Sequence, residues 1–149
     1  MRRDGAIATT LLVLIGVLEA RESAREIADL TGALRLTASG AGLTSLGLAA
    51  SVVVYLLLGW RARDDGRALR VGAIVGVAAG LIGGTLRAVI IRDALTDAVG
   101  RYVAVPEWFV PVALAAFVVF SAIVSAIGGA AVAFAGARIS RSARSRPPA

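Results

Sequence analysis

Long stretches without charged residues limit most strongly what this chain can fold into. The clearest is 40–60, where 21 consecutive residues carry no charge. At about 1.5 Å per residue, a helix of this length reaches about 31 Å and matches the hydrocarbon core of a bilayer. The stretch 71–91 is interrupted only by Arg87, and 109–137 contains 29 uncharged residues. These three stretches predict helices that span a membrane.

The first apolar stretch, 5–18, is open to three interpretations. Its 14 residues are fewer than the about 20 that a span needs. We favour a spanning helix that continues through 19–30 as a polar extension and ends near Gly32, a plausible helix C-cap. The alternatives are an interfacial helix and a cleaved signal peptide, because basic residues precede the apolar stretch as they do in a signal peptide.

The polar segments between and after these stretches predict connections and a tail. Segment 61–70 holds four arginines and two aspartates and predicts a short loop between antiparallel helices. In 93–105 the apolar residues follow helical spacing, which predicts a short amphipathic helix at the interface with Asp93 as its N-cap. Segment 138–149, with four arginines and two prolines, predicts a disordered tail.

Together these segments predict an all-α integral membrane protein. We expect one domain over 1–137, a bundle of four transmembrane helices of which the first is short. The amphipathic helix is expected on the outer side, between the third and fourth spans. The four helices are expected at about 5–30, 40–60, 71–91 and 107–137, followed by the basic tail at 138–149.

The distribution of arginine predicts the orientation. All sixteen basic residues are arginines. With four spans, ten arginines lie on the side of both termini and the 61–70 loop, and six lie on the other side. Because cytoplasmic loops carry the excess of basic residues, both termini are expected in the cytoplasm. The expected location is a cell membrane of the bacterial inner-membrane type, crossed several times.

Small residues at four-residue intervals are the most specific local pattern. Such residues lie on one face of a helix and let another backbone approach closely. The third stretch contains one such stripe and the fourth contains a second. The predicted helix-packing residues are Gly72, Gly76, Gly80 and Gly84, together with Ser121, Ser125, Gly129 and Ala133. We favour a seam between helices of one chain, and the alternative is a seam between subunits of a homo-oligomer.

Arg87 is the only charge inside the spanning stretches. It lies near the outer end of its helix, at a height that Glu19 and Glu107 are expected to share. A structural ion pair at the outer interface is the favoured interpretation. The alternatives are an arginine that extends its side chain to the interface, and an anion or substrate site.

The composition excludes several classes of chemistry. The chain has no cysteine and no histidine, so disulfides, thiolate nucleophiles, haem–histidine ligation and Cys/His zinc sites are excluded. No catalytic, cofactor-binding or metal site is predicted. Despite a formal charge of +6, nucleic-acid binding is not expected, because the arginines flank apolar stretches.

The expected function is therefore that of a non-enzymatic, structural or accessory subunit or modulator of a membrane assembly. The alternative is an oligomeric channel or small transporter. The expected partners are the lipid bilayer and either a second copy of the chain or another membrane protein.

Overall fold

The computed structural model describes residues 2–29, 38–62, 64–102 and 106–144. These residues form four helices and no strand, which confirms the all-α prediction for this part of the chain. The helices are α1 (Arg2–Asp29), α2 (Ala38–Ala62), α3 (Asp65–Tyr102) and α4 (Phe109–Arg144). Three of them are long and apolar enough to cross a membrane, over Ser45–Ala62, Asp65–Asp93 and Phe109–Ala143.

Helix α1 is not one of these three candidate spans. It is 28 residues long, but nine of those residues are charged, and most of these follow Leu18. The polar half, from Glu19 onward, lowers the mean hydropathy below what a spanning segment requires. A fourth span formed by α1 therefore stays a prediction.

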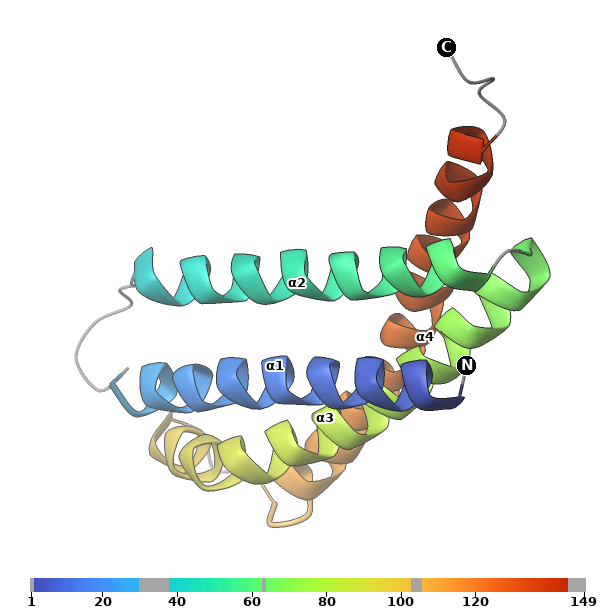
Figure 1. Cartoon of the computed structure of the whole chain (residues 1–149). Helices are drawn as coiled ribbons and strands as arrows, with labels where there is room; N and C mark the ends of the chain where they lie inside the picture. The colour runs from blue at the N-terminus through green and yellow to red at the C-terminus, as the bar shows by residue number, and fades with distance from the viewer. Residues whose placement is uncertain (1, 30–37, 63, 103–105, 145–149) are drawn as a thin grey trace.

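The four helices pack as an irregular bundle (Figure 1). Helices α3 and α4 make the most extensive contact, followed by α1 with α3 and by α2 with α4. Helices α1 and α2 lie side by side, whereas α4 crosses α2 at a steep angle near the end of α2 and continues past it (Figure 1). Helix α3 contacts each of the other three helices.

Small residues fill the interior of this bundle, and large apolar residues point outward. Most of the buried core residues are alanines, including Ala20, Ala68 and Ala133, which are completely buried. Large side chains such as Ile74, Phe120 and Ile127 are about two-thirds exposed. Water-soluble proteins bury such side chains, whereas helices in lipid use small residues for contact and turn large apolar residues to the lipid tails.

The predicted separate helix at 93–105 is wrong in the described part of this segment. Helix α3 continues without a break from Asp65 to Tyr102, so Asp93 lies inside the helix and not at its N-terminus. After Ile91 the residues change from apolar to polar. This change alters what surrounds the helix but removes no backbone hydrogen bond, so the helix can continue. The Thr96 hydroxyl also donates to the Arg92 carbonyl at 2.8 Å. Residues 103–105 lie outside the described part of the chain.

The predicted loop over 61–70 is also wrong, because α2 ends at Ala62 and α3 already begins at Asp65. The carboxylate of Asp64 accepts a hydrogen bond from the Arg67 backbone N–H at 3.1 Å. This bond satisfies one of the free N–H groups of the first turn, as an N-cap does. The cap lets the helix start almost immediately after the preceding one.

The predicted disorder of 138–149 is wrong for 138–144, because α4 extends to Arg144. The helix continues because one side of it still packs against the bundle. Ala137 and Ser140 are both about 1% exposed, and Ala137 joins a buried cluster with Ala62 and Ala68. The last five residues lie outside the described part.

Candidate functional site

The glycine stripe of α3 lies directly against the backbone of α4. A Cβ atom added at Gly76 would meet the Ser125 carbonyl and would lie 2.8 Å from the Cα of Ala126. One added at Gly80 would lie 2.6 Å from the Cα of Ala122. Carbon atoms in favourable contact are about 3.5–4.0 Å apart. Any side chain at these positions would therefore force the two helices apart.

The seam is tight along its length and loosens toward Gly84. A Cβ at Gly72 would lie 2.8 Å from the Ala133 Cβ and would meet the Gly129 carbonyl, whereas one at Gly84 would lie 3.4 Å from the Ser121 Cβ. All eight predicted helix-packing residues thus lie along one contact between α3 and α4. The face that an oligomer could have used is occupied by a helix of the same chain.

A second backbone contact, between α2 and α4, was not predicted from the sequence. A Cβ at Gly59 would meet the carbonyl of Ala133, and one at Gly136 would meet the carbonyl of Leu56. These glycines belong to no stripe of four-residue spacing. The only signal was that Gly136 follows Gly129 by seven residues, which puts both near one side of α4. This contact fixes the point at which α2 and α4 cross.

Of the three charged residues predicted to form an ion pair, Glu19 lies near Arg87 and Glu107 does not. The Glu19 carboxylate lies within electrostatic reach of Arg87. It also packs on α2, where a Cβ at Gly47 would lie 2.8 Å from the Glu19 Cδ. Glu107 is exposed and forms no ion pair in the part of the chain that the structure describes. The Arg87 guanidinium stands 5.9 Å from the centre of the Phe117 ring.

A groove of about 340 Å³ lies between the helices on this same side of the α2–α4 crossing. Past the crossing, α2 and α4 diverge (Figure 1). Residues of both helices, among them Ser51 and Ser125, line the groove. All four helices contribute to its walls. Its polar lining groups are Arg87, Ser51, Tyr55, Ser121 and Ser125, and the other lining residues are apolar or glycine.

Three glycines leave this groove open. A Cβ atom added at Gly16, Gly83 or Gly128 would have no other atom within 4 Å, and all three residues line the groove. They differ in this from the seam glycines, whose missing side chains are replaced by the backbone of another helix. The four-residue spacing places Gly84 on the stripe and Gly83 off it, but it does not show that Gly83 faces an open groove, because this depends on where α2 and α4 lie.

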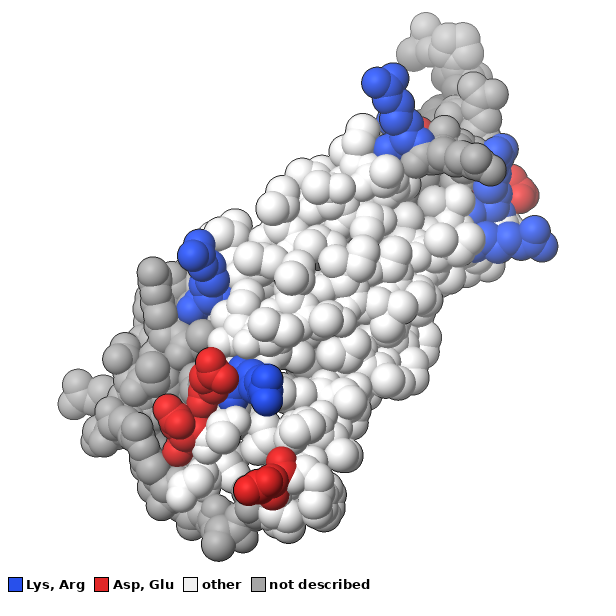
Figure 2. Space-filling model, turned by 90° about the horizontal axis from the view of Figure 1, so that it is seen from below, with Lys and Arg blue, Asp and Glu red and all other residues white. Residues whose placement is uncertain are grey.

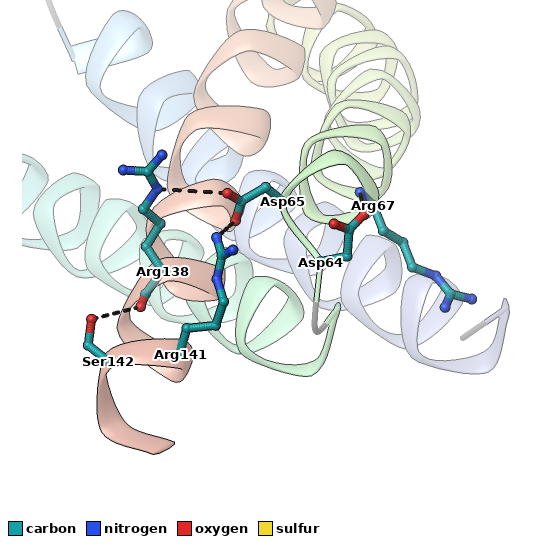
Figure 3. A network of polar contacts seen from close by, with 6 residues as sticks. All are labelled: Asp64, Asp65, Arg67, Arg138, Arg141 and Ser142. Atoms are coloured by element: carbon teal, nitrogen blue, oxygen red, sulfur yellow. Dashed lines mark hydrogen bonds and ion pairs between the residues drawn. The ribbon is translucent and has the colours of Figure 1, made fainter. Parts of the chain in front are cut away.

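At the end of the bundle away from Arg87, ion pairs join the helix ends. We call this the basic end, formed by Asp4, 61–62, 64–70 and 138–144. Figure 3 shows that Asp65, at the start of α3, faces two arginines of α4. Arg141 donates to one carboxylate oxygen of Asp65, and Arg138 lies 3.8 Å from the other. Arg61 pairs with Asp4 at 2.8 Å, which connects α2 to α1.

Charged side chains thus gather at both ends of the molecule, and an uncharged band separates them on the face that Figure 2 shows. Over the described residues the fold is all-helical, with three helices long and apolar enough to cross a membrane. Comparison with known protein families, with curated proteins and with solved structures finds no match.

Proposed function

We propose that this chain is a non-enzymatic integral membrane protein that serves as a structural or accessory subunit, or as a modulator, of a membrane assembly. The observation that supports this role most directly is the outward display of large apolar side chains around a core of small residues. On α4, Phe120, Ile123 and Ile127 are all more than half exposed. Their spacing of three and four residues places them on one stripe, which is available to lipid or to a second membrane protein.

The α3–α4 seam supports the same proposal. Backbone contact without intervening side chains holds two long helices at a fixed distance, so the stripe on α4 is presented by a rigid support. The alternative function, an oligomeric channel or small transporter, is supported by the groove, because it combines hydroxyl groups with a charged residue between spanning helices.

The accessory role predicts that the chain purifies from its own membrane in mild detergent as part of a larger complex of defined mass. Phe120→Ala and Ile127→Ala together should reduce recovery of that complex by at least about tenfold, because they remove the two most exposed side chains of the stripe. The control is Ile74→Ala, which removes an equally exposed apolar side chain from α3. Purification as a homo-oligomer without another protein would contradict the accessory role and favour the channel.

We further propose that α1 forms the fourth span and that both termini are cytoplasmic, in a cell membrane of the bacterial inner-membrane type. The arginine excess at the basic end supports this orientation. Reporter fusions after residues 30 and 100 should be active only with an externally active reporter, and fusions after 65 and 149 only with a cytoplasmic one. External activity at 65 or 149 would overturn the orientation. A reporter at the N-terminus that lies on the same side as residue 30 would contradict a spanning α1.

A further inference from the structure

We propose that the groove between α2 and α4 holds one acyl chain of a membrane phospholipid and that Arg87 binds its phosphate. This inference uses the membrane insertion proposed above but does not depend on the accessory role. It starts from the volume of the groove, about 340 Å³. That volume falls within the range of about 300–1,000 Å³ that is typical of sites for small ligands.

The edges of the groove open toward the surroundings of the bundle. On the α2 side, Leu48 and Val52 line the groove and are exposed. On the α4 side, Val124 and Gly128 do the same. With these helices inserted, the surroundings are lipid tails. A lipid chain can therefore enter sideways between α2 and α4 without passing through water.

The glycines explain why the groove favours a chain over a vacant space. Around Gly16, Gly83 and Gly128, no atom lies within 4 Å of an added Cβ apart from the two chain neighbours and the backbone of the same helix. An unfilled apolar gap loses the dispersion contacts of its walls, and methylene groups restore them.

Arg87 supplies the charge that selects the headgroup. It lines the groove on the side where Glu19 and Phe117 lie. A guanidinium carries five N–H donors, so it can interact with the Glu19 carboxylate and bind a phosphate oxygen at the same time. Charge-assisted bonds of this kind are the strong ones. The apolar walls and the cation together match an amphiphile with one anionic group.

The test is native mass spectrometry of the whole chain, delipidated and then supplied with palmitoyl-oleoyl-phosphatidylglycerol or with the diacylglycerol of the same chains. The wild type should retain one phosphatidylglycerol molecule, at least about tenfold more strongly than the diacylglycerol. Gly83→Leu should reduce retention of both lipids by at least about tenfold, because its side chain fills the groove.

Gly100→Leu is the matched control, since Gly100 also has no atom within 4 Å of an added Cβ but does not line the groove. It should bind lipid like the wild type. Arg87→Gln should bring phosphatidylglycerol retention down to the diacylglycerol level and leave diacylglycerol unchanged. If Gly83→Leu misfolds, Gly128→Leu fills the same groove from α4.

Wild-type retention in folded groove-filling variants would overturn the acyl-chain site. An undiminished preference for phosphatidylglycerol in Arg87→Gln would overturn the phosphate contact. Neither result would affect the accessory role, which is tested separately by the mass of the complex and by the stripe on α4.

Discussion

Replacing Gly76 or Gly80 with isoleucine is expected to lower the free energy of unfolding by at least about 2 kcal/mol. At both positions an added side chain would overlap the backbone of α4, at Ala126 or Ala122. Backbone cannot rotate away as a flexible side chain can, so α3 and α4 would have to separate along the seam. Thermal unfolding in detergent, followed by circular dichroism, measures the effect.

Gly83→Ile is the matched control for the seam. It places the same side chain on the same helix, at a position where no atom lies within 4 Å of the Cβ. Its unfolding temperature should stay within a few degrees of the wild type. Because the seam lies within one chain, the Gly76 variant should lose stability without a change in oligomeric state. Dissociation into folded monomers would instead show that the stripe joins subunits.

The second large effect is expected at the crossing of α2 and α4. Gly59→Leu should destabilise this contact by at least about 2 kcal/mol, because its Cβ would meet the Ala133 carbonyl and lie 2.8 Å from the Ala133 Cα. The natural chain lacks cysteine, so a single Ala62→Cys reports on the separation. Ala62 is 2% exposed at the basic end, and its labelling by a maleimide should rise by at least about tenfold.

The control for this experiment is Gly66→Leu in the same Ala62→Cys background. Gly66 is exposed, and an added Cβ would meet only the Asp64 carboxylate, at 3.5 Å. Labelling should therefore stay at the level of the unsubstituted background. Equal labelling of the Gly59 and Gly66 variants would show that backbone contact at Gly59 does not hold α2 in place.

The positions of the apolar helices could be predicted from the sequence because long stretches without charge mark them. The predicted helix at 40–60 is observed at Ala38–Ala62, and the predicted start at 107 is observed at Phe109. The polar ends could not be predicted in the same way. Beyond the apolar stretch, a helix ends where capping or packing ends it. Neither the packing of Ser140 nor the continuity of α3 past Asp93 is visible in hydropathy.

The candidate site was predictable only in part, for a related reason. The seam glycines repeat at a regular interval that one helix alone reveals. Gly59 of α2 contacts α4 and Gly136 of α4 contacts α2, each at a single point. The groove glycines are recognised only because no other helix lies near them. Both properties belong to the arrangement of several helices. Glu107 was predicted to pair with Arg87 because both were expected at the same height along the bundle. Height does not determine which side of the bundle a residue faces, so it does not predict pairing.

Because α3 is one unbroken helix, a movement at one of its ends is transmitted to the other end. From the close contact at Gly80, the helix extends about 33 Å to Tyr102 and about 22 Å to Asp65. A tilt of about 5° around Gly80 would move the Tyr102 end by about 3 Å and the Asp65 end by about 2 Å in the opposite direction. Asp65 is the residue that Arg138 and Arg141 bind. Because the seam couples α4 to α3, pressure on the Tyr102 end of α3 would be carried to the basic end, where Asp65 holds these arginines.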